Sequence, residues 1–153
     1  MKLNDDLSGP AHPETWYPLA SRPRDSFTPI IEAGEGAIEA PFIFRHNKFY
    51  YLFVSFDYCC RGIESNYKIM VGRSLELPGP YIDRLGFPML MGGGTLILSG
   101  NKDYPGVGHN AVCNFNGQDY IVFHAYEAAE NGRPKLMVKE FKWDKDGWPV
   151  VNF

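Results

Sequence analysis

The chain has 153 residues and a formal net charge of −3. This length predicts one domain with a sizeable core, and the charge gives no electrostatic reason to expect nucleic acid or an anionic membrane as a partner. The aromatic content is high (Tyr 9, Phe 11, Trp 3) and turn-forming residues are frequent (Gly 16, Pro 12), which is typical of an all-β protein.

The first 37 residues are the least regular part of the sequence. They predict a short strand over 1–4, a turn over 7–10 and a loop over 33–36 that leads into Glu39, while four prolines break any helix between them: Pro13, Pro18, Pro23 and Pro29. The start lacks the apolar core of a signal peptide, and no apolar run reaches membrane-spanning length. We therefore expect a cytoplasmic protein, or an exported one whose signal has been removed.

From residue 40 onward the chain alternates apolar runs with turn signals. The expected strands of the first part are 40–44, 49–56, 67–73 and 95–98, with a tight turn at His46-Asn47. The expected strands of the second part are 110–115, 120–126, 135–143 and 149–151, and Asn116-Gly117 is a strong hairpin signal.

The two parts repeat with a period of about seventy residues, the spacing of a propeller with long loops. Each copy predicts a four-stranded antiparallel meander, which is the architecture of a propeller blade. We divide the chain into a stray strand with an irregular connection (1–37), a first complete blade (38–105) and a second blade (106–153). Propellers typically have 4–8 blades, so two blades predict a partial β-propeller.

Glu39 lies directly before Ala40-Pro41 and an apolar run. Proline fixes its own φ and pushes the preceding residue toward extended conformations, so we expect Glu39 on a constrained backbone at a strand mouth. A partly desolvated carboxyl group at such a place suits a general acid. The alternative is a surface glutamate before an edge strand, and this segment alone favours that alternative.

The meander topology predicts which distant residues meet. The start of the first strand lies beside the end of the second, so Glu39 shares an edge with residues 56–60, and His109 shares the equivalent edge with His124 and Tyr126. First strands line a propeller axis, so Glu39 and His109 should converge at one channel mouth that suits sugar binding. The expected substrate-binding residues are Phe56, Asp57, Cys59, Cys60, Gly93, His124 and Tyr126.

Three cysteines do not make a disulfide framework. Cys59 and Cys60 are adjacent, and a disulfide between neighbours would strain the peptide that joins them. We therefore expect two free thiols there, while Cys113 is distant in sequence.

Seven segments of the sequence resemble the endo-1,5-α-L-arabinanases of glycoside hydrolase family 43. The resemblance runs from about Leu19 to the C-terminus and rests on 38–43, 51–62, 67–74, 92–95, 108–112, 123–126 and 143–149. It implies a five-bladed β-propeller, which agrees with the blade repeat. It also implies hydrolysis of α-1,5-linked arabinan with inversion at the anomeric carbon.

The resemblance implies roles for single residues. Glu39 matches the general acid, and a second carboxylate roughly 6.5–9.5 Å away would activate water in an inverting enzyme. His109 matches a histidine that supports a calcium-type ion on the propeller axis, with water as most of the ligands, although a histidine hydrogen-bonded to backbone is an equally good reading. No residue matches the base or the orienting aspartate, because the chain starts after both.

Five other carboxylates lack the right context for either missing role: Asp5, Asp6, Asp25, Asp57 and Asp83. Hydrolysis is therefore expected to be weak or absent. Three functions stay open at this point: an arabinanase-type hydrolase completed by assembly, a non-catalytic carbohydrate-binding remnant, and a plain β interaction module. The expected partners are arabinan or its oligosaccharides and either a second copy, most simply in a dimer, or a complementary propeller half.

Overall fold

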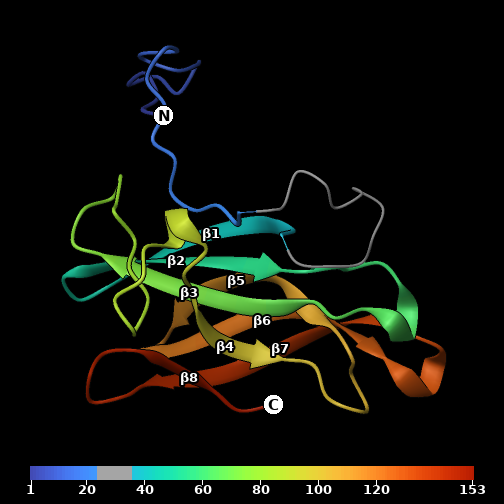
Figure 1. Cartoon of the computed structure of the whole chain (residues 1–153). Coiled ribbons are helices and arrows are strands. Elements are labelled where there is room, and N and C mark those ends of the chain that lie inside the picture. Colours follow the sequence, from blue (N-terminus) through green and yellow to red (C-terminus); the bar gives the residue numbers. More distant parts are fainter. Residues whose placement is uncertain (24–35) are drawn as a thin grey trace.

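The structure is a computed structural model and describes residues 1–23 and 36–153. Eight strands form two four-stranded antiparallel sheets in simple sequence order (Figure 1). The first sheet contains β1 (Ile38–His46), β2 (Phe49–Phe56), β3 (Lys68–Ser74) and β4 (Thr95–Ser99), and the second contains β5 (Val107–Phe115), β6 (Gln118–Glu127), β7 (Arg133–Trp143) and β8 (Pro149–Val151). Helical structure in the described residues is limited to three single 3-10 turns, Gly62–Glu64, Met89–Met91 and Ala128–Glu130.

The two meanders confirm the all-β prediction, with small changes at the strand ends. β1 and β5 begin earlier than expected, at Ile38 and Val107. His46 still pairs with Phe49, so the first hairpin turn lies one residue later, at Asn47 and Lys48.

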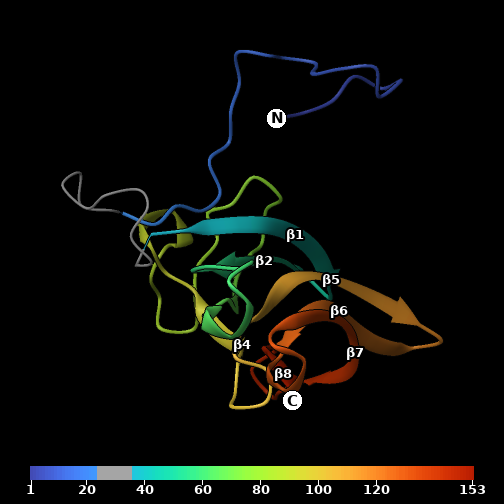
Figure 2. The same cartoon turned by 90° about the vertical axis from the view of Figure 1, so that its right-hand side faces the viewer.

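The N-terminal segment extends away from both sheets in the two views (Figures 1 and 2). The prediction of a strand over 1–4 is wrong, because in the described part of the chain Leu3 forms only an isolated bridge, with Pro10. Most of the predicted loop over 33–36 lies outside the described residues. No described segment forms a helix with the length and hydrophobicity needed to cross a membrane.

The main core lies between the sheets. Phe53 and Val71 of the first sheet and Ile121 and Phe123 of the second are completely or almost completely buried there. Along β6 buried and half-buried residues alternate, as expected for a strand with one covered face.

The first sheet, in contrast, is covered on both faces. Six consecutive residues of β2 are buried, because Leu52 and Val54 pack into a second apolar cluster with Tyr81 and Met89 from the connection between β3 and β4. A strand covered on both faces requires a continuous apolar run, and residues 49–56 supply it.

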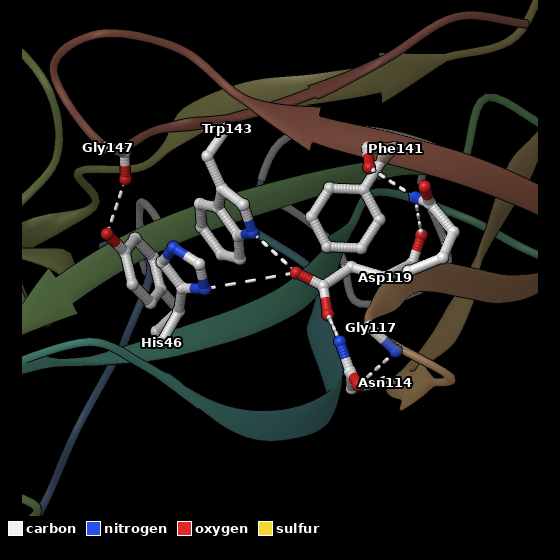
Figure 3. A network of polar contacts seen from close by, with 9 residues as sticks. His46, Asn114, Gly117, Asp119, Phe141, Trp143 and Gly147 are labelled. Carbon is white, nitrogen blue, oxygen red and sulfur yellow. Dashed lines mark hydrogen bonds and ion pairs between the residues drawn. The ribbon is translucent and has the colours of Figure 1, made fainter.

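A polar clasp joins the sheets at the end of the strands where the hairpin turns lie (Figure 3). The buried Asp119 carboxylate accepts hydrogen bonds from Trp143 Nε1 at 2.6 Å and from Asn114 Nδ2 at 2.7 Å. His46 of the first sheet stacks on Trp143, with ring centroids 4.0 Å apart, and places Nδ1 3.8 Å from the same carboxylate. These contacts link the hairpin end of the first sheet to the hairpin end of the second sheet.

Candidate functional site

Each sheet carries an irregularity at the start of its first strand. In β1 the pairing register shifts between Glu39 and Phe42, and in β5 it shifts between Gly108 and Ala111. Each bulge holds a non-glycine residue with a φ of 53°, Ala40 in β1 and His109 in β5. Bulges of this kind are common beside active sites, because they re-aim side chains.

The conformation of Ala40 corrects one expectation. The sequence predicted an extended residue before Pro41, but Ala40 adopts the left-handed region. Between the pairs Glu39–Ser55 and Phe42–Phe53, β1 has two residues where β2 has one, so β1 must accommodate one extra residue. Glu39 is exposed rather than partly desolvated. Within residues 1–23 and 36–153, the carboxyl group is hydrogen-bonded on one side, since Tyr67 Oη donates to Glu39 Oε1 at 2.5 Å.

Two histidines lie next to this tyrosine. His124 stacks on the Tyr67 ring with centroids 5.6 Å apart, and the rings of His109 and His124 are 6.2 Å apart. Burial lowers the pKa of His124, nearby His109 lowers it further, and Glu39 opposes the shift. Both predicted strand-mouth residues, Glu39 and His109, are therefore close enough to influence the pKa of His124. Because this pKa is lowered, His124 carries a neutral imidazole at neutral pH.

Ser55 connects the two bulges. It is completely buried, it pairs with Glu39 in the ladder between β1 and β2, and its Oγ accepts a hydrogen bond from the His109 backbone N–H at 2.8 Å. The structure thus brings together the residues predicted at the first-strand mouths of the two sheets.

Tyr126 links this cluster to the pair of cysteines. Its ring meets the His124 ring edge-on at 5.1 Å, and its hydroxyl accepts a hydrogen bond from the Cys60 backbone N–H at 2.8 Å. Cys59 and Cys60 form a disulfide, so the prediction of two free thiols there is wrong. Cys60 adopts a φ of 66° and is held by Tyr126, so the backbone of this turn brings the two sulfurs together. Cys113 is free and exposed.

Asp57 and Phe56 form a neighbouring group with Arg22. The Asp57 carboxylate is buried and lies 2.6 Å from both Arg22 Nη1 and Lys68 Nζ. Burial raises its pKa, but the hydrogen bonds and charges of Lys68 and Arg22 outweigh this, so the pKa lies below its usual range. The Arg22 guanidinium also covers the Phe56 ring at 4.3 Å. Asp57 is therefore fully engaged within the chain.

Gly93 has a different environment from the rest of the predicted set. A Cβ there would lie 2.6 Å from the carbonyl oxygen of Phe87 and 2.8 Å from that of Pro88. The backbone of Phe87 and Pro88 therefore occupies the space beside Gly93.

Sequence reasoning missed Tyr67, Ser55 and Asn110 as site residues. Asn110 is buried, and neither polar atom of its amide has a hydrogen-bond partner among the described residues. His124 Nε2 is also buried and without a partner in the same part of the structure. The available signal was the Gly-His-Asn tripeptide, which places a polar side chain directly after His109.

An apolar depression of about 290 Å³ adjoins Glu39 and is lined by Leu19, Ala20, Ile38, Pro41, Leu52 and Val54. The described residues contain no cluster of three or more His, Cys, Asp or Glu side chains able to hold a metal ion.

Comparison with known proteins places this chain in a family. Residues 16–149 match the sequence profile of Glycosyl hydrolases family 43. The extracellular exo-α-(1→5)-L-arabinofuranosidase of Cellvibrio japonicus is 47% identical over 152 residues, which cover 99% of this chain and 44% of that protein. The extracellular endo-α-(1→5)-L-arabinanase 1 of Bacillus subtilis is 44% identical over 133 residues, covering 87% of this chain and 37% of that protein.

Solved structures of arabinanases resemble this chain as well. The Cellvibrio cellulosa α-L-arabinanase complexed with arabinohexaose has a TM-score of 0.90 and 47% identity, covering 99% of this chain and 48% of that one. The chain therefore spans about half the length of these relatives. The likeness confirms the predicted partial propeller of the five-bladed type. The bulged strand mouths, the blade-like sheets and the sequence match together lead to one assignment: this chain belongs to glycosyl hydrolase family 43.

Proposed function

We propose that the chain acts on α-1,5-linked arabinan as a glycoside hydrolase of the endo, inverting type, with Glu39 as the general acid. The observation that carries this proposal is the Glu39 carboxyl group, exposed on one side and tied on the other to buried Tyr67, beside the neutral imidazole of His124. The relatives named above are an exo-α-(1→5)-L-arabinofuranosidase and an endo-α-(1→5)-L-arabinanase, which supports the substrate class.

In the proposed reaction Glu39 protonates the oxygen of the leaving sugar, while a second carboxylate activates water on the opposite face. Asp57 is a poor candidate for that base, because Arg22 and Lys68 already occupy its oxygens. No other described carboxylate joins the cluster around Tyr67. We therefore expect slow hydrolysis by this chain.

The proposed sugar-binding residues keep their predicted list: Phe56, Asp57, Cys59, Cys60, Gly93, His124 and Tyr126. The geometry supports His124 best, because its buried Nε2 has no partner in the described part of the chain and suits a sugar hydroxyl. Tyr126 and the Cys59–Cys60 disulfide extend the surface beside it. For Gly93 the support is weakest, because backbone fills its space.

Replacing Glu39 by glutamine tests the acid role. We expect the variant to lose at least about 100-fold of any turnover on debranched arabinan, while calorimetric binding of arabino-oligosaccharides stays unchanged. Glu140→Gln is the matched control, because Glu140 is exposed on β7. Wild-type turnover in Glu39→Gln would exclude the assignment, and chromatography of the products would separate endo from exo cleavage.

A non-catalytic sugar-binding role is the second candidate. The engagement of Asp57 favours it, since His124 keeps a partnerless Nε2 for a sugar hydroxyl among the described residues, while Glu39 is the one carboxylate of the cluster that remains available. Binding of arabino-oligosaccharides without release of reducing ends by the wild-type chain would support this candidate over the hydrolase.

We also propose that the chain assembles with a second copy. The outer face of the second sheet leaves Leu136 and Val138 76% and 56% exposed, and an open apolar depression of about 410 Å³ containing Leu19 and Ile43 lies on the opposite flank. Two copies about a two-fold axis would supply four blades, enough for a closed propeller. We expect a dimer by light scattering that Val138→Glu weakens. A wild-type monomer at micromolar concentration would contradict this and leave a complementary propeller half as the partner.

A calcium ion at His109 is a further proposal, and it rests on the resemblance. His109 is exposed and its backbone N–H is bound to Ser55, so the ring is free to face an ion held mostly by water. Calorimetric titration with calcium, with His109→Ala as the comparison, tests it, and equal heats for the two proteins would exclude the role.

A further inference from the structure

Tyr67 is a large polar side chain with 0% of its surface exposed. It stands directly before β3 and is separated from β1 by β2, yet its hydroxyl reaches across to Glu39 Oε1 at 2.5 Å. Buried tyrosine hydroxyls normally find a partner. Here the partner is the residue proposed as the acid.

The second sheet fixes the position of the Tyr67 ring. A Cβ on Gly108 would lie 2.2 Å from Tyr67 Cδ1 and 2.3 Å from Cε1, so only glycine leaves room for the ring at this point. His124 stacks on the ring at 5.6 Å, and the Tyr67 carbonyl accepts a hydrogen bond from the Val107 N–H at 3.0 Å. The ring is therefore held from both blades.

The Tyr67 hydroxyl also keeps its proton. Burial raises its pKa well above the usual range, and the hydrogen bond to Glu39 raises it further, while Ser55 opposes the shift. At every pH where a carboxylic acid can protonate a sugar oxygen, Tyr67 is thus a donor. Oε1 of Glu39 is the acceptor of this bond, which leaves Oε2 to carry the transferable proton.

We propose that Tyr67 is a positioning residue that holds the Glu39 carboxyl group with Oε2 directed at the leaving oxygen. This inference rests on the proposed function. When the O–H bond of Oε2 breaks, its proton passes to the glycosidic oxygen, and Glu39 becomes a carboxylate. The bond between that oxygen and the anomeric carbon breaks, while a water molecule bonds to the anomeric carbon from the opposite face and releases a proton to solvent. The Tyr67 bond then becomes charge-assisted and stronger. Solvent returns the proton to Glu39 afterwards.

Tyr67→Phe keeps the ring and removes only the hydroxyl. Its matched control is Tyr81→Phe, because Tyr81 is also buried and donates its hydroxyl to the Leu77 carbonyl at 2.9 Å, in the second apolar cluster. Two substrates separate positioning from general damage. Arabinan has a poor leaving group that needs an acid, whereas p-nitrophenyl α-L-arabinofuranoside has a good leaving group that does not.

We expect Tyr67→Phe to lower kcat on arabinan by about 10–100-fold, a part of what general acid catalysis contributes, and to leave kcat on the nitrophenyl substrate close to that of Tyr81→Phe. An equal loss on both substrates would assign Tyr67 a structural role. Unchanged turnover on arabinan would also overturn the inference.

A second measurement does not depend on turnover. In the proton NMR spectrum a buried hydroxyl bound to a carboxylate gives a downfield resonance, which Tyr67→Phe should remove and Glu39→Gln should shift upfield. If the wild-type chain cleaves neither substrate, the proposed hydrolysis fails, and this resonance alone decides whether Tyr67 holds Glu39. A Tyr67 resonance that Glu39→Gln leaves in place would refute the positioning role.

Discussion

Phe53→Ala is expected to lower the free energy of unfolding by about 3–5 kcal/mol, the usual cost of removing a buried phenylalanine ring. Phe53 lies at the centre of β2 with no exposed surface and belongs to the core between the sheets. Both neighbours of β2 are paired strands, so the backbone around a cavity there has little freedom to collapse. Since small domains are stable by only about 5–15 kcal/mol, the variant is expected to be close to its unfolding threshold.

Urea unfolding at pH 7 measures this loss. Phe115→Ala is the control, because Phe115 sits at the end of β5 with 66% of its surface exposed and should change stability little. Equal stability of the two variants would mean that the sheets do not share the core described above.

Asp57→Asn is expected to cost about 2–3 kcal/mol at pH 7, because it leaves the Arg22 and Lys68 charges without a buried counter-charge, with Lys68 partly relieved by solvent. The pKa of Asp57 is lowered in the folded protein. Its stabilisation is therefore complete above the ordinary aspartate pKa of about 3.9 and is lost as the pH falls through the lower folded-state pKa.

The difference between wild type and Asp57→Asn should consequently be constant near neutral pH and shrink below about pH 4. Unfolding curves at pH 7 and pH 3 measure it. Asp103→Asn is the control for the same chemical change, because Asp103 is exposed. A difference that persists unchanged at pH 3 would show that Asp57 acts through packing instead of charge.

The strand order and the core were predictable from sequence, because both depend on local patterns. The continuous apolar run at 49–56 and the Asn116-Gly117 turn each define their elements without reference to the rest of the chain. The predicted N-terminal strand did not form, because a strand also needs a partner strand, which a local pattern cannot supply. Among the described residues Leu3 pairs only with Pro10.

The site was predictable only in outline. The propeller arrangement, in which first strands line the axis, correctly brought the mouths of β1 and β5 together, but it treats a strand as regular and cannot anticipate a bulge. Tyr67 was missed because its contact with Glu39 crosses an intervening strand and depends on the absence of a side chain at Gly108. The Cys59–Cys60 disulfide was missed because the left-handed backbone at Cys60 has no simple sequence signal.

The matching bulges show that one backbone conformation can carry different side chains in different blades. The two left-handed positions are created by strand pairing, and one is occupied by alanine while the other is occupied by histidine. Strand pairing thus builds the same left-handed conformation around a methyl group in one blade and around an imidazole in the other. The chemistry of this position differs between the two blades while its backbone conformation stays the same.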